Sequence, residues 1–165
     1  MTVNQELHIT RTFDVTKETL FDMWTNPHHL KHWWAPAGFT VNVASIELKP
    51  GGIFHYSQTS TDDQTQWGKF VYREIEKPDR LVYVSSFSDE KAQIVRAPFH
   101  SSWPLEILNT MTFTESDGKT TLSIQGIPIS ANEEEHTLFR ASHEGIKQGF
   151  IGTFDKLETY LKESK

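Results

Sequence analysis

The stretch that decides the fold class lies near the C-terminus and reads SANEEEHTLFRASHEGIKQGFIGTFDKLETYL, residues 130–161. Three glutamates follow Asn132, a residue type that caps helices, and negative charge at that end suits the helix dipole. Large side chains then recur at alternating intervals of three and four, at Phe139, His143, Ile146, Phe150, Thr153 or Phe154, Leu157 and Leu161. The pattern predicts one long helix, ending at about Leu161, that buries only one face.

The same helix contains Gly145, Gly149 and Gly152. Each glycine in a helix interior costs about 1 kcal/mol relative to alanine. Their spacing places them together, beside the apolar stripe. Two explanations stay open: close contact between this flank and a sheet, or space for a bound molecule.

The rest of the chain predicts a sheet for this helix to pack on. Residues 6–14 alternate apolar and polar side chains as a half-buried strand does, with Arg11 as an exception on the inner face. Thr16 can cap a short helix, and Asn26-Pro27 opens a second one. Between Phe39 and Gly126 about six strand-like runs follow, separated by turn residues at 50–52, 62–63, 78–79 and 117–118.

This order of elements predicts an α+β domain. We expect a curved antiparallel sheet of about six or seven strands wrapped around the long C-terminal helix, with two short helices after the first strand. A curved sheet touches a straight helix along one line only, and the space left elsewhere commonly holds a ligand.

Length, charge and composition narrow the kinds of protein that this chain can be. The 165 residues fit a single domain, 1–165, and 16 basic against 22 acidic residues give a net charge of -6. This balance disfavours nucleic acid and anionic membranes as partners. There is no cysteine, which excludes disulfides and thiolate chemistry. The first ten residues lack the features of a secretion signal, so we expect a cytoplasmic location.

Several motifs together resemble a known superfamily. They are FD at 13–14, LFDMWTNP at 20–27, LKHWWAP at 30–36, GF at 38–39, LKPGG at 48–52, IEKPDRLVY at 75–83, TFTE at 112–115 and QGFIGTFDKL at 148–157. Their order and spacing are similar to the SRPBCC superfamily, with its START-like, birch-pollen-allergen-like helix-grip fold. Within it, the chain resembles the subfamily of the activator of the heat-shock-protein-90 ATPase, with Phe150 where tryptophan is more usual.

Other chemistries find little support in the sequence. His28, His29 and His32 form the most tempting cluster, but they lack the spacing and the carboxylate that a zinc site needs, so we expect no metal and no cofactor. Serines occur without a nucleophile elbow, and Gly51-Gly52 lacks the lysine of a phosphate-binding loop.

Acid–base catalysis stays open, because polar residues on strands could point into a cavity. The candidates are His55, Arg73, Glu47, Asn109 and Gln125, with solvent exposure on the outer face as the alternative for each. His143 stands out because it replaces an apolar residue on the buried helix stripe. Either a hydrogen-bonded core histidine or a catalytic one fits that position.

Aromatic side chains could line a pocket or fill the core. Alternation puts Phe54 with Tyr56, and Phe70 with Tyr72, on common faces, so these pairs are the best candidates for an inner wall. The full set expected to bind a ligand is Trp34, Phe54, Tyr56, Phe70, Tyr72, Tyr83, Phe87, Trp103, Met111, His143, Gly149 and Phe150.

The leading hypothesis is binding of a small hydrophobic or aromatic molecule in a cavity between the C-terminal helix and the sheet. The resemblance implies two alternatives, a polyketide cyclase/aromatase-like or hydrolase-like enzyme and a co-chaperone-like activator of a heat-shock ATPase. A long connection at 88–104 carries Phe99 and Trp103. An exposed tryptophan there would favour self-association, which leaves a homodimer open.

Overall fold

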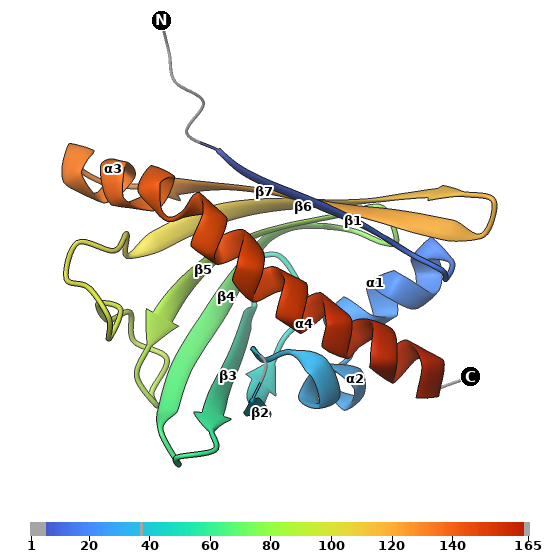
Figure 1. The fold of residues 1–165 in the computed structure, drawn as a ribbon, viewed down its shortest axis with the longest axis horizontal. Helices are drawn as coiled ribbons and strands as arrows, with labels where there is room; N and C mark the ends of the chain where they lie inside the picture. The colour runs from blue at the N-terminus through green and yellow to red at the C-terminus, as the bar shows by residue number, and fades with distance from the viewer. Residues whose placement is uncertain (1–5, 37, 164–165) are drawn as a thin grey trace, which may run out of the picture.

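A computed structural model describes residues 6–36 and 38–163 of the chain. Within these residues it contains seven strands and four helices (Figure 1). Their order is β1 (Leu7–Phe13), α1 (Lys17–Thr25), α2 (Pro27–Trp33), β2 (Phe39–Ile46), β3 (Ile53–Ser60), β4 (Thr65–Glu76), β5 (Arg80–Ser88), β6 (Glu106–Ser116), β7 (Lys119–Ile129), α3 (Glu133–Ala141) and α4 (His143–Glu163).

The strands form one antiparallel sheet in the order β1-β7-β6-β5-β4-β3-β2. Strands β2 to β7 are a meander, as the sequence predicts, and β1 returns to pair with β7. Asp117 and Gly118 both have positive φ, 55° and 78°, in the turn between β6 and β7, where an Asp-Gly pair suits a tight hairpin. The register shifts between Val43 and Ser45 and between Tyr72 and Glu74, and such bulges bend a sheet.

The short helices begin where the sequence predicts. The Thr16 side chain accepts a hydrogen bond from the Thr19 amide, and the Asn26 side chain accepts one from the His28 amide. Pro27 occupies the first turn of α2, where its missing N–H is not needed. These caps fix the two helices at one end of the sheet, where they carry Trp24 and Trp33 into the core.

The C-terminal segment differs from the single helix expected, because it is interrupted at Ser142. Asn132 and Glu135 form a capping box that starts α3, which confirms the predicted cap. At the other end of α3, the Ser142 hydroxyl donates to the Leu138 carbonyl at 2.8 Å, and its amide bonds to the carbonyls of Leu138 and Phe139. A serine that bonds back to the preceding turn commonly bends a helix, and the 21-residue α4 starts on its far side.

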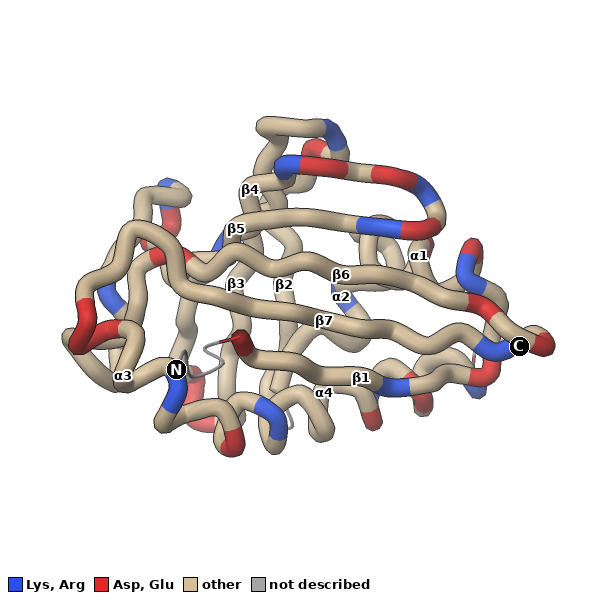
Figure 2. Tube along the Cα trace, turned by 90° about the horizontal axis from the view of Figure 1, so that it is seen from above, with Lys and Arg blue, Asp and Glu red and all other residues tan. Residues whose placement is uncertain are grey.

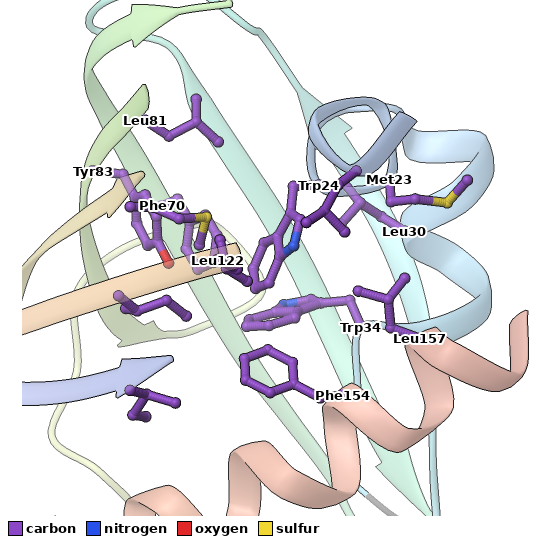
Figure 3. Close-up of a cluster of buried hydrophobic side chains, with 14 of the residues drawn as sticks. Met23, Trp24, Leu30, Trp34, Phe70, Leu81, Tyr83, Leu122, Phe154 and Leu157 are labelled. Atoms are coloured by element: carbon purple, nitrogen blue, oxygen red, sulfur yellow. The ribbon is translucent and has the colours of Figure 1, made fainter. Parts of the chain in front are cut away.

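Helix α4 crosses the concave face of the sheet diagonally (Figure 1). Its buried residues are Thr153, Phe154, Leu157 and Leu161, all in its C-terminal half. Figure 3 shows Phe154 and Leu157 reaching from α4 toward the Trp34 ring. Helix α4 therefore packs tightly on the sheet and the short helices along one half of its length only.

Contacts with α4 explain why a charged residue, Arg11, stands on the inner face of β1. Its Nη2 atom lies 2.7 Å from Asp155 and 3.0 Å from Glu158 on α4. Its guanidinium also lies over the Phe154 ring, 5.9 Å from the ring centroid. A long side chain of this kind packs its stem on apolar surface and keeps its charge near solvent, so Arg11 ties β1 to α4.

Charged residues gather at the strand ends and on the helices, with both signs mixed, while the middle of β6 and β7 is free of them (Figure 2). No helix among the described residues is long and apolar enough to span a bilayer.

Candidate functional site

The inner wall of the sheet begins with the aromatic side chains of β3 and β4. Phe54 lies opposite Phe70 in the strand register, with ring centroids 5.2 Å apart. Tyr56 contacts both rings, at 4.9 Å and 5.8 Å. The structure thus places Phe54, Tyr56 and Phe70 together on the concave face, as their alternation predicts.

Trp34 connects this wall to the helices. Its ring lies 5.9 Å from Tyr56, 5.5 Å from Phe70 and 6.5 Å from Phe150 of α4. Tyr83 stacks on the far side of Phe70 at 4.1 Å (Figure 3). Seven of the expected site residues are at most 8% exposed and belong to the hydrophobic core, namely Trp34, Phe54, Phe70, Tyr72, Tyr83, Trp103 and Met111.

A pocket of about 100 Å³ lies on the concave face, where the β3–β4 hairpin meets the end of β5 and the loop that precedes β6. Three of the expected residues line it, Tyr56, Phe87 and Trp103. The other lining residues are Gln58, Gln66, Trp67, Gly68, Ser85, Ser86, Pro104 and Ile107. Tyr56 and Trp103 both pack against the aromatic core and line the pocket.

The expected residues of α4 stand apart from this pocket. The His143 ring contacts Phe139 at 5.1 Å, and Phe139 in turn contacts the lining residue Trp103 at 5.7 Å. Phe150 packs against Phe154 and Trp34. Gly149 is exposed on the flank of α4.

Gly145 and Gly149 do not make the close contact with the sheet that was one of the two explanations for them. A Cβ added at either position would meet no atom within 4 Å. Replacing Gly149 by alanine should therefore stabilise the protein by up to about 1 kcal/mol, because it lowers the entropy of the unfolded chain and creates no clash. Urea denaturation of Gly149→Ala and the unmodified protein measures this. A lower midpoint for the variant would contradict the open flank.

Hydrogen-bonded polar side chains form the second wall of the pocket. Gln58 donates from Nε2 to the Trp34 carbonyl at 3.1 Å, and its Oε1 accepts from Gln66 Nε2 at 3.0 Å. Asn109 donates from Nδ2 to Ser85 Oγ at 2.9 Å. Extending the Phe54 and Tyr56 alternation by one step would have found Gln58, whereas Gln66 and Ser85 needed the strand register.

The tyrosine hydroxyls on this face remain protonated near neutral pH. Burial raises the pKa of Tyr56 to about 12, with an opposing contribution from the neighbouring Trp34 side chain. Burial also raises the pKa of Tyr72 and of Tyr83. Each phenol is therefore a neutral group that can donate a hydrogen bond.

The Tyr72 hydroxyl is buried and has no hydrogen-bond partner among the described residues. An unsatisfied buried hydroxyl costs about 1–3 kcal/mol. Tyr72→Phe should therefore leave the stability unchanged or raise it by about 1 kcal/mol, although most core substitutions lower it. Thermal unfolding tests this, and a clear loss of stability would show that the hydroxyl has a partner.

The loop at 89–105 closes the pocket from one side. Trp103 is 8% exposed, so the expectation of an exposed tryptophan is wrong; Phe99, at 61%, is the exposed ring of this loop. Arg96 donates from Nη1 to the Trp103 carbonyl at 3.1 Å and to the Glu135 carboxylate at 2.6 Å. The Asn132 amide and Arg96 together lower the pKa of Glu135. These bonds hold the loop against the start of α3.

The polar strand candidates for acid–base chemistry lie outside the pocket lining, although Asn109 bonds to the lining residue Ser85. Glu47, Arg73 and Gln125 are exposed. His55 stacks on Trp67 at 4.9 Å, and its Nε2 lies 3.1 Å from the Asp89 carbonyl.

The α2 histidines make contacts between helices. His29 Nδ1 lies 2.7 Å from the Tyr160 hydroxyl, and its Nε2 lies 3.1 Å from the Asp22 carboxylate. These contacts join α1, α2 and α4. In the part of the chain that the structure describes, no group of three histidine or carboxylate side chains is arranged to hold a metal ion.

Solved structures share this fold over nearly the whole chain. Protein Ms6760 from Mycobacterium smegmatis has a TM-score of 0.79 at 22% identity, covering 98% of this chain and 93% of that one. A protein from Arthrobacter aurescens has a TM-score of 0.80 at 23% identity, covering 96% and 87%. DynU16, from the dynemicin biosynthetic locus, has a TM-score of 0.67 at 15% identity, covering 99% of this chain and 49% of that one.

These likenesses confirm the helix-grip fold. No curated protein matches the sequence at a significant level. A family model does match, over residues 14–162, and its description is activator of Hsp90 ATPase homolog 1-like protein. Because the match covers most of the sequence, the chain belongs to the activator of Hsp90 ATPase homolog 1-like family.

Proposed function

We propose that this protein binds a small hydrophobic or aromatic molecule in the pocket between Tyr56, Phe87 and Trp103. The observation that carries the proposal is the composition of the lining, in which aromatic rings face a few fixed polar groups. Ligand sites typically combine apolar walls with a small number of well-placed hydrogen-bonding groups. The pocket lies on the concave face that α4 crosses, at the end where α4 carries no buried side chain.

The family supports the proposal at the level of the fold. Proteins with this fold commonly bind hydrophobic ligands, and DynU16, from a biosynthetic locus, shares the architecture over 99% of this chain. Fold alone does not fix the function, so the proposal depends on the pocket itself.

Native mass spectrometry of the freshly purified protein is the direct test. A ligand retained from the cell appears as a defined mass difference between the native and the denatured protein. We expect such a difference, and we expect it to disappear in Phe87→Asp, which puts an unpaired charge into the lining. Ile151→Asp, at a residue 46% exposed on α4, is the matched control.

Two results would count against the proposal. One is a ligand that is retained equally by the unmodified protein and by a folded Phe87→Asp variant. The other is a clean apo mass together with stimulation of a heat-shock ATPase by the purified protein, which would favour the co-chaperone alternative.

A further inference from the structure

The described residues that line the pocket are all uncharged. Among the described residues that line it, none is lysine, arginine, histidine, aspartate or glutamate. A charged ligand group moved from water into such a site would have no opposite charge to offset its lost hydration. The lining therefore favours a neutral ligand.

The polar wall is built from amides held in place by the protein. Gln58 is only 8% exposed, and it uses one Nε2 hydrogen on the Trp34 carbonyl and its oxygen on Gln66. A side-chain amide has two N–H donors and an oxygen that accepts two bonds. The Gln58–Gln66 pair therefore keeps both donor and acceptor capacity beyond these two bonds.

Ser85 adds a further donor to the lining, from β5. Its Oγ accepts the bond from Asn109 at 2.9 Å, which leaves the hydroxyl hydrogen for another acceptor. A group that both donates and accepts satisfies this wall, whereas a ketone or an ether uses only its donors. A hydrocarbon would leave the remaining donors and acceptors of these groups unpaired, which is costly where water is excluded.

Size limits the ligand further. The pocket measures about 100 Å³. An engineered cavity of about 150 Å³ in another protein accommodates benzene. The pocket is smaller than that cavity, so a single ring enters it only in part, against Phe87, Trp103 and Ile107, with the rest of the molecule at the mouth. Fused rings or long acyl chains exceed the space.

Taking the proposed function as its basis, we propose that this pocket is selective for neutral single-ring compounds bearing a carboxamide group. The ring packs against Phe87 and Trp103. The carboxamide bonds to Gln66 and Gln58 in the manner of a paired amide.

Four probes of related shape test the selectivity: benzamide, benzoate, toluene and 2-naphthamide. Benzoate changes the charge, toluene removes the polar group, and 2-naphthamide adds a ring. Because Trp67 and Trp103 line the pocket, tryptophan fluorescence and calorimetry on the full chain report binding. We expect benzamide to bind at least tenfold more tightly than the other three, since one hydrogen bond or one uncompensated charge accounts for a factor of about ten or more.

A matched pair of variants tests the role of the amide. Gln66→Leu keeps the approximate volume and removes both the donor and the acceptor, and Gln64→Leu makes the same change at an exposed position outside the lining. Benzamide affinity should fall about tenfold in Gln66→Leu and stay unchanged in Gln64→Leu, while toluene affinity is retained in both.

The outcomes separate this inference from the proposed function. Toluene binding as tightly as benzamide, with no effect of Gln66→Leu, would overturn the amide selectivity and leave an apolar binding pocket intact. Tighter binding of benzoate or 2-naphthamide would overturn the charge or the size argument in the same way. Binding of none of the four to the unmodified protein would overturn both proposals at this pocket.

Discussion

Replacing Phe154 by alanine is expected to lower the free energy of unfolding by about 3–5 kcal/mol, the usual cost of removing a buried aromatic ring. Phe154 is 1% exposed, and its ring meets Phe13 at 5.8 Å and Trp24 at 6.4 Å, both edge-to-face. These contacts attach α4 to β1 and α1. The substitution therefore leaves a cavity where the helix meets the sheet and also weakens the attachment of the helix.

Phe150→Ala is the matched control, one turn earlier on the same stripe. Phe150 is only partly buried, so its loss should cost about 1–2 kcal/mol. Urea denaturation gives both values, and near-UV circular dichroism shows whether the tryptophan environment survives. Equal costs for the two variants would mean that α4 is held along its whole length, contrary to the one-sided contact in the structure.

The order and type of the elements follow from local chemistry, which is why the sequence predicts them. Thr16, Asn26 and Asn132 cap their helices with side chains that act within three residues. The Asp117-Gly118 turn is equally local. The break at Ser142 was missed because a serine is compatible with a helix interior, and only its bond back to Leu138 shows the bend.

The site was harder to predict, because its residues are far apart in the sequence. The strand register and one loop bring them together. Alternation correctly grouped Phe54 with Tyr56, but it could not show that Phe70 and Tyr83 would stack in the core while Tyr56 reached the pocket. Trp103 depends on Arg96, whose partner Glu135 lies 39 residues away. A single sequence carries no signal for that pairing.

Gly68→Ala is expected to reduce benzamide affinity by at least tenfold. Gly68 lies opposite Tyr56 in the register, and a Cβ at this position would come within 2.6 Å of the Tyr56 hydroxyl and 2.8 Å of its ring. A glycine inside a strand commonly marks such a close approach of a neighbour. The added methyl group must therefore displace Tyr56, which lines a pocket of only about 100 Å³.

The same displacement should lower stability by about 1–3 kcal/mol, as overpacking usually does. Gly145→Ala is the control, since an added Cβ there meets no atom within 4 Å. Calorimetric titration and urea denaturation of both variants measure the two effects. Undiminished affinity in a folded Gly68→Ala variant would place the ligand somewhere other than beside Tyr56.

The double variant Tyr56→Phe/Gly68→Ala tests whether displacement of Tyr56 causes these losses of affinity and stability. Removing the hydroxyl relieves the shortest of the contacts that the new methyl group makes, so the two substitutions should be coupled: Gly68→Ala should cost less stability in the Tyr56→Phe background. Additive effects would mean that the methyl group acts on the strand backbone rather than on Tyr56. A smaller loss of stability in the Tyr56→Phe background, together with restored benzamide affinity, would show how Gly68 keeps the pocket open. Its missing side chain leaves the space that the Tyr56 ring occupies.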